Sequence, residues 1–407
     1  MLKPIHAPDR HPEMRLAEFG IDWQADPGLY ASERIMNYES AARESMSQRD
    51  GKTRMAPALS KAKSSWAATF MAEGQVCQAA SIQPGPTQSY RYPVTLKEEI
   101  PHAARLYGTA VRGVRQLMSS AILGSLNTGL ATELVDGLVS SLEHNPNALF
   151  SLSSLRRHGP YTYTHCVNVA ILLAAYALSD GKDRATVMAY GTAGLLHDVG
   201  KAMLPVSLLN ARRKLNEHEQ RLVRLHPLLA YEVLSSFADI RRTVLRAVLE
   251  HHERYDGSGY PRGLSGENIS EIGQVAGIAD TYDALSSHRP FQNAVNPHKS
   301  LGLMYRMRKK DFHPLLVEKF VRLMGIYPVG SIVELKDGYK GVVSAGNPNN
   351  PMKPSVILVL DPQGKSMRMH ECDLANDAAA DISHYIPVEL SGIDPCLTLG
   401  LESIHLT

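Results

Sequence analysis

Apolar residues recur at helical spacing through most of the chain between residues 94 and 326. Thr95-Leu96-Lys97-Glu98 has the form of a capping box, and the apolar positions that follow predict a long helix. A second helix is expected over 132–143, where Asn145-Pro146 ends it. These two helices would pack against each other, so residues 94–150 are predicted to form an antiparallel helical hairpin.

Residues 151–326 have the pattern of a helical bundle. The stretch 164–178 is apolar nearly all round, which is typical of a buried central helix. A second capping box, Asn216 to Glu219, opens one of the helices that follow. The remaining helices are predicted over 184–201, 216–237, 239–252, 273–286, 297–308 and 314–324.

The pattern changes after residue 326. Short β-rich runs at 331–335, 341–344 and 355–360 are separated by turn-forming pairs, so 327–375 is predicted to be a small β appendage. Residues 376–407 are expected to be an irregular tail. Residues 1–93 are polar and poorly periodic, and we expect a poorly structured or divergent N-terminal region. The predicted fold class is therefore mainly α, with a helical bundle between the hairpin and the β appendage.

Composition narrows the class of protein. The 407 residues are 44% hydrophobic and 21% charged, as in soluble globular proteins, and the net charge of +2 argues against a long nucleic-acid partner. The start of the chain has no apolar signal region, and the longest apolar run, 167–178, is short for a membrane span. Four cysteines without CxxC spacing indicate reduced thiols. A cytoplasmic protein without a membrane partner is expected.

Seven imidazoles and carboxylates stand out in the bundle, because both groups ligate divalent metals. Seven ligands exceed the three that one ion in a hydrolase usually takes, and they suit two ions with a bridging carboxylate. Adjacent residues on a helix point about 100° apart, so His197 and Asp198 can reach neighbouring ions, and Asp198 is the natural bridge. The seven candidates are His165, His197, Asp198, His226, His251, His252 and Asp280.

Each candidate has an ordinary alternative when taken alone. A single buried histidine is more often a core residue than a ligand, and Asp280 would serve as a helix salt-bridge partner. Lys201 lies on the His197-Asp198 face and needs an anionic group between itself and the metals. Joint occurrence on five predicted helices favours the two-metal interpretation.

The chain resembles the HD-GYP family of cyclic dinucleotide phosphodiesterases, a branch of the HD superfamily, over about residues 155–325. The resemblance rests on the order and spacing of its motifs. These are Tyr161 to His165 with Asn168, His197-Asp198-Val199-Gly200-Lys201, His226-Pro227, His251 to Pro261, Ala279 to Leu285, and Arg289-Pro290.

The resemblance implies that residues 151–326 form an HD-type helical bundle that is the catalytic domain, and it implies specific roles for the side chains there. The seven candidates fall on the family's metal ligands, for two divalent ions that are commonly iron or manganese, and Lys201 and Asp198 form the catalytic pair. Gly259, Tyr260 and Pro261 form the loop beside the substrate, and Arg289 contacts a phosphate of the substrate. The implied substrate is cyclic di-GMP, cleaved to linear pGpG and potentially onward to GMP. Diguanylate cyclase-type proteins are potential partners through the same loop.

Two positions depart from the family pattern. Members with three metals carry glutamate where this chain has Tyr161, so we expect two ions. Gln292 replaces a lysine that often accompanies Arg289, which predicts weaker phosphate binding and slow cleavage of pGpG. Asp283 would orient Lys201 or a metal ligand, or form a plain helix salt bridge.

Three functions compete at this stage. The first is an active cyclic di-GMP phosphodiesterase. The second is another HD-superfamily phosphohydrolase, acting on a nucleotide or on the mixed guanine–adenine cyclic dinucleotide. The third is a non-catalytic module that binds a nucleotide or a partner. No ligand of the family is lost in this chain, which argues against the third function. His226 and the His251-His252 pair exceed the ligands that a simple HD-superfamily nucleotidase needs, which argues against such a nucleotidase.

Overall fold

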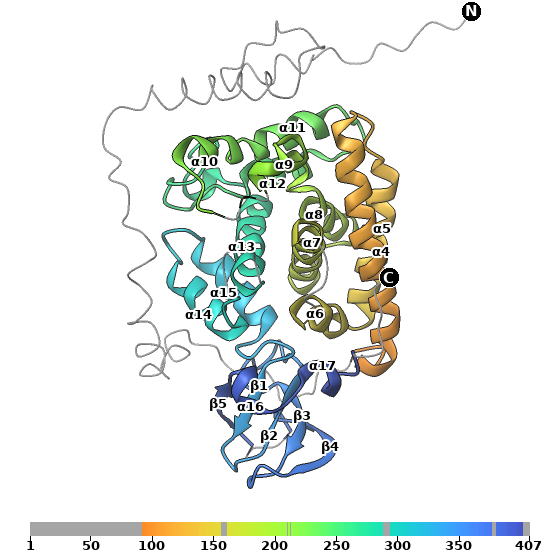
Figure 1. Cartoon of the computed structure of the whole chain (residues 1–407), viewed down its shortest axis with the longest axis vertical. Helices are drawn as coiled ribbons and strands as arrows, with labels where there is room; N and C mark the ends of the chain where they lie inside the picture. Colours follow the sequence, from red (N-terminus) through yellow and green to blue (C-terminus); the bar gives the residue numbers. More distant parts are fainter. Residues whose placement is uncertain are drawn as a thin grey trace, which may run out of the picture.

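The computed structural model describes residues 92–155, 161–209, 211, 213–287, 294–376 and 380–401. The expectation for residues 1–93 therefore falls outside the described residues, apart from the last two positions. A helical bundle occupies most of the described chain, and a small sheet lies at one end of it (Figure 1). The expected fold class, mainly α with a β-rich C-terminal part, is confirmed.

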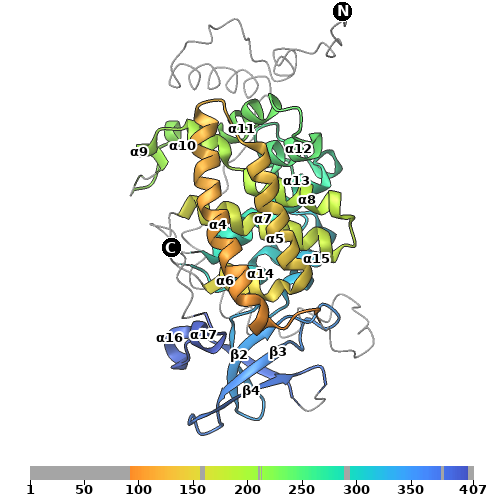
Figure 2. The same ribbon diagram turned by 90° about the vertical axis from the view of Figure 1, so that its right-hand side faces the viewer.

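A helical hairpin precedes the bundle. It consists of α4 (Leu96–Ile122) and α5 (Thr128–His144), which run side by side along the bundle in both views (Figure 2). The capping box at Thr95 is present, with the Thr95 side chain accepting from the Glu98 amide and the Glu98 side chain accepting from the Thr95 amide. The short α6 (Pro146–Leu155) follows. The buried faces of these helices join the main core, so the hairpin is packed onto the bundle.

The centre of the bundle is α7 (Tyr161–Ser179), which packs against α8 (Arg184–Leu196) and α13 (Glu271–Ser286). This helix is long and apolar enough to cross a membrane, but 72% of its apolar window is buried inside the protein. Its position among other helices explains the apolar residues on nearly all of its faces. It is a core helix of the bundle.

Two of the predicted helices are interrupted in the structure. The helix expected over 184–201 ends at Leu196, and a 3₁₀ turn, η3 (Val199–Met203), follows. The helix expected over 216–237 is divided into α10 (Glu217–Val223) and α11 (His226–Ser235), because Pro227 lacks the amide needed to continue a helix and favours its first turn. Both interruptions occur at candidate ligands. The other elements are α9 (Val206–Leu209), α12 (Arg242–Glu250), η4 (Gly266–Asn268), α14 (Pro297–Arg306) and α15 (Pro314–Met324).

The C-terminal part is a five-stranded antiparallel sheet in the order β4-β3-β2-β1-β5. Its last strand pairs with β1, with Ile386 opposite Ile332. The expectation of an irregular tail from residue 376 is therefore wrong for this segment, because β5 is stabilised by a partner about fifty residues earlier in the chain. The strands are β1 (Ile332–Leu335), β2 (Lys340–Ala345), β3 (Ser355–Leu360), β4 (Ser366–Asp373) and β5 (Ile382–Ile386), followed by α16 (Val388–Ser391) and α17 (Pro395–Thr398).

Candidate metal centre

The structure brings all seven candidate ligands together from five helices. His165 lies on α7, His197 and Asp198 directly follow α8, and His226 is the first residue of α11. The His251-His252 pair follows α12, and Asp280 lies on α13. Six of the seven are buried, and the His252 side chain is 17% exposed. Helix ends supply five of the seven ligands, so the two interruptions in the predicted helices place His197, Asp198 and His226 at the site.

The ligand atoms separate into two groups that share Asp198. The first group is His165, His197 and Asp280, and the second group is His226, His251 and His252, with the ligand atoms of each group within 4.8 Å of one another. Asp198 Oδ2 lies 3.4 Å from His197 Nε2, while Asp198 Oδ1 lies 3.2 Å from His226 Nε2. The two oxygens of one carboxylate therefore face different groups, as a bridge between two ions requires.

The tautomers of the histidines follow from their backbone contacts. Nδ1 of His197, His226 and His251 lies 2.7 Å from the carbonyl oxygens of residues 194, 223 and 248, so each Nδ1 carries the proton and donates it. In a neutral ring, Nε2 is then a bare lone pair. Yet His226 Nε2 and His251 Nε2 lie only 3.2 Å apart. Two lone pairs at this distance repel each other unless a cation lies between them.

Protonation of a histidine would remove the repulsion between Nε2 atoms in the first group, but not in the second group. Burial by itself would lower the pKa of His165, but hydrogen bonds to Asp280 and Asp283 raise that pKa to about 9. In contrast, burial lowers the pKa of His226 and, together with neighbouring histidines, holds the pKa values of His251 and His252 well below the usual value. The second group therefore keeps its rings neutral, which is the form that binds metal. The donor set fits two divalent cations.

Lys201 contacts the bridging carboxylate directly. Its Nζ lies 2.5 Å from Asp198 Oδ2, and the lysine side chain is 25% exposed. Burial alone would raise the pKa of Asp198, but His197 and Lys201 hold that pKa well below its usual range. Asp198 is thus the anionic partner that the lysine requires. This position depends on Gly200, since a Cβ there would lie 2.1 Å from the His226 carbonyl oxygen.

Asp283 orients His165, and not Lys201. Its Oδ2 lies 2.6 Å from His165 Nδ1, and its Oδ1 accepts from Asn168 Nδ2 at 2.7 Å. Tyr107 from the hairpin then donates to Asn168 Oδ1 at 2.8 Å. This series of hydrogen bonds sets the tautomer of His165 and leaves its Nε2 available to bind a metal ion. Asn168 belongs to the motif around His165, but the role of Tyr107 has no local sequence signal, because Tyr107 lies on α4, 61 residues before Asn168.

Tyr161, which stands at the position of a third-metal glutamate, stacks on His165. The two ring centroids are 5.3 Å apart, and the rings are inclined by 18°. A phenol is a poorer ligand for a divalent metal than a carboxylate. This arrangement favours a site for two ions.

The Gly259-Tyr260-Pro261 loop packs against the second group. The Tyr260 ring stacks on His252 with centroids 4.6 Å apart, and the Arg224 guanidinium lies 5.3 Å from the Tyr260 ring centroid. Gly259 is required here because a Cβ would lie 2.3 Å from the Arg254 amide nitrogen. The buried Glu253 accepts backbone hydrogen bonds from residues 262 and 264, which holds the returning chain in place. Arg289 and Gln292, the expected phosphate-binding positions, lie outside the described residues.

Comparison with known proteins agrees with this geometry. Residues 141–316 match the HD domain family, and residues 332–388 match a KOW domain associated with HD domains. With its paired histidine groups and Gly259-Tyr260-Pro261 loop, the chain belongs to the HD-GYP group of HD domain proteins. The KOW match includes β5 and extends beyond the end at residue 375 that the strand pattern predicted.

Among its relatives is the cyclic di-GMP phosphodiesterase PA4108 of Pseudomonas aeruginosa, 37% identical over 67% of this chain and 66% of that protein. The cyclic di-GMP phosphodiesterase response regulator RpfG of Xanthomonas campestris is 42% identical over 31% of this chain and 34% of its own length. The 3'3'-cGAMP-specific phosphodiesterase 3 of Vibrio cholerae is 36% identical over 36% and 31%, respectively. The chain thus spans just under two thirds of the first relative and about a third of the other two.

Proposed function

We propose that this protein is a metal-dependent phosphodiesterase that hydrolyses cyclic di-GMP to linear pGpG. The observation that carries the proposal is the division of seven ligands into two groups bridged by Asp198, with Lys201 on the bridge. The names of the Pseudomonas and Xanthomonas relatives support the same substrate. Further cleavage to GMP would depend on how Arg289 and Gln292 bind the terminal phosphate of pGpG.

The side chains of the site have distinct tasks in this reaction. Two divalent ions, once bound, would polarise the phosphodiester and activate the attacking water. The first and second groups would hold the ions, with the Asp198 carboxylate shared between the two groups. Lys201 contributes a fixed positive charge that stabilises the negative charge on the phosphate oxygens in the transition state. Asp283 keeps the proton of His165 on Nδ1, so that Nε2 remains oriented toward the first ion.

We propose iron or manganese as the resident metal. The ligand set combines imidazole nitrogen with carboxylate oxygen, which suits both of these metals, and zinc also accepts such ligands. A cytoplasmic location follows from the proposed substrate, an intracellular signal. The exposed face of the loop at residues 259–261 is proposed to contact diguanylate cyclase-type partners, which make that substrate.

A second candidate substrate is the mixed guanine–adenine cyclic dinucleotide. It is favoured by the Vibrio cholerae relative, whose name specifies 3'3'-cGAMP. A metal-reconstituted hydrolysis assay should compare cyclic di-GMP, the mixed dinucleotide and pGpG at equal concentrations. The proposal expects the highest kcat/KM with cyclic di-GMP. Faster turnover of the mixed dinucleotide would support the second candidate, and failure to cleave any of the three would refute phosphodiesterase activity.

A further inference from the structure

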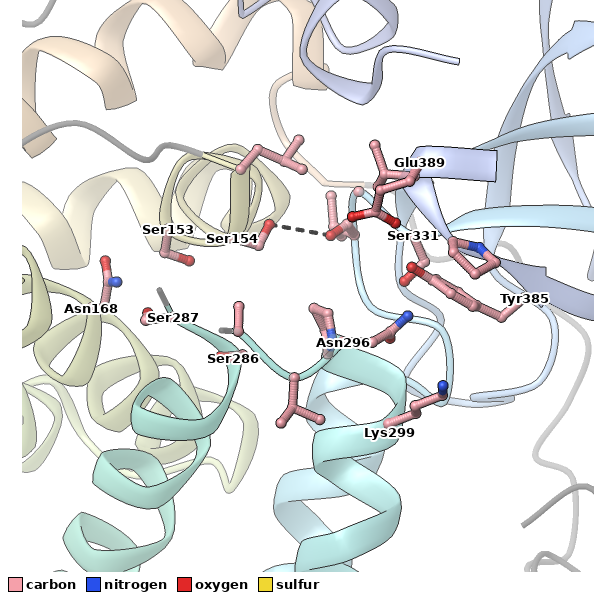
Figure 3. A pocket seen from close by; sticks show the side chains of 18 of the residues that line it. Ser153, Ser154, Asn168, Ser286, Ser287, Asn296, Lys299, Ser331, Tyr385 and Glu389 are labelled. Atoms are coloured by element: carbon pink, nitrogen blue, oxygen red, sulfur yellow. Dashed lines mark hydrogen bonds between the residues drawn. The ribbon is translucent and has the colours of Figure 1, made fainter. Parts of the chain in front are cut away.

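A cavity of about 720 Å³ lies where the helical bundle meets the C-terminal sheet. Figure 3 shows Ser153, Asn168 and Ser287 on the bundle side of this cavity, and Ser331 and Tyr385 on the side of the C-terminal sheet. Its size is within the range of small-molecule binding sites, roughly 300–1,000 Å³. We call it the junction cavity.

The junction cavity shares a wall with the metal centre. Tyr161 lines the cavity and stacks on His165, with ring centroids 5.3 Å apart. Asn168 also lines it and donates to Asp283, the carboxylate that orients His165. A molecule in the cavity would therefore lie one side chain away from the first metal group.

The lining combines polar and apolar side chains and carries few charges. Most of the polar side chains are hydroxyls and amides, and in the described part of the lining only Lys299 and Glu389 are charged. The Ser331 hydroxyl is buried, and among the described residues it has no hydrogen-bond partner. A buried hydroxyl without a partner is unfavourable, so the Ser331 hydroxyl would gain from a ligand that brings its own donors and acceptors.

We propose that the junction cavity holds the guanine nucleotide of cyclic di-GMP that is remote from the reacting phosphate. This inference rests on the proposed function and gives the C-terminal sheet a part in substrate recognition. Guanine presents two adjacent N–H donors on its Watson–Crick edge, and the two oxygens of Glu389 would accept both. Adenine has a ring acceptor at the corresponding position, which a carboxylate repels. Lys299 would contact phosphate, Ser331 a ribose hydroxyl, and Tyr385 the face of the base.

Binding of mononucleotides tests the cavity without relying on catalysis. Calorimetry in EDTA should detect GMP binding to the full chain and weaker AMP binding. Glu389→Gln should weaken GMP binding about tenfold, since it removes one charge-assisted contact, and Lys299→Ala should weaken GMP and AMP alike. Glu133→Gln on α5 and Lys365→Ala on the β3–β4 turn are matched controls and should bind as the native protein does. Equal binding of GMP and AMP, or a Glu389→Gln variant that matches its control, would overturn the assignment.

Kinetics distinguish a part of the substrate from a separate nucleotide. If the cavity receives half of cyclic di-GMP, GMP should inhibit hydrolysis competitively, and Glu389→Gln should raise KM for cyclic di-GMP about tenfold, whereas the control Glu133→Gln should leave that KM unchanged. Purely non-competitive inhibition by GMP would overturn the assignment to the substrate. A native protein that binds GMP in the cavity but does not cleave cyclic di-GMP would refute the proposed function and not the nucleotide site.

Discussion

Replacing Asp283 with asparagine should weaken metal binding at the first group selectively. The buried carboxylate accepts from His165 Nδ1 at 2.6 Å, from Asn168 Nδ2 at 2.7 Å and from Ser287 Oγ at 3.1 Å. An amide has a single acceptor oxygen, so its NH₂ group must face either His165 or Asn168, both of which donate. One buried donor then loses its partner, which is unfavourable by about 1–3 kcal/mol.

The expected loss of metal affinity is roughly 10- to 100-fold, as for other changes to the group that orients a ligand histidine. Titration of the holoprotein with a graded series of chelators, followed by metal analysis, would measure it. Asp283→Asn should lose one equivalent early and retain the other, because the second group has no contact with residue 283. Asp180→Asn is a matched control, since Asp180 pairs with Lys182 and Lys319 away from the site. Unchanged retention of both ions in a folded Asp283→Asn variant would refute the role assigned to Asp283.

Four other predictions follow. Anaerobically purified protein should contain close to two metal equivalents, and His226→Ala should reduce this to about one by elemental analysis; an unchanged content would contradict the second group. Asp198→Ala should abolish hydrolysis, whereas Lys201→Ala should lower kcat by about 10²–10³ with the metals retained, and metal loss in Lys201→Ala would contradict its assigned role. Because burial lowers the pKa of the second-group imidazoles below the ordinary 6.5, they stay neutral as the pH falls to that value, so the ion held by the second group should be retained down to about pH 6.5 and lost only in more acidic buffer. Native protein should accumulate pGpG, and Gln292→Lys should speed pGpG cleavage more than cyclic di-GMP cleavage by chromatographic assay; equal effects on both steps would contradict the role of Gln292.

The sequence alone determined the identity of the candidate ligands and most of the helices. Whether a side chain can bind a metal depends on its residue type, so the sequence alone identifies His197-Asp198 and His251-His252 as candidate metal ligands. Helical periodicity is equally local, because it reflects contacts between residues three and four positions apart. For that reason α15 has the bounds that its pattern predicts, and the capping boxes at Thr95 and Asn216 form as expected.

Tertiary structure decided which groups meet. The helix that begins at Arg184 stops at Leu196, the following turn places Gly200 against the backbone of α11, and Asp198 faces both histidine groups from that turn. Asp283 binds His165, 118 residues earlier in the chain, and β5 is a strand because β1 offers it a partner. The junction cavity exists only where the bundle and the sheet are packed together. Such contacts depend on the packing of segments far apart in the chain, and local sequence preference carries no information about that packing.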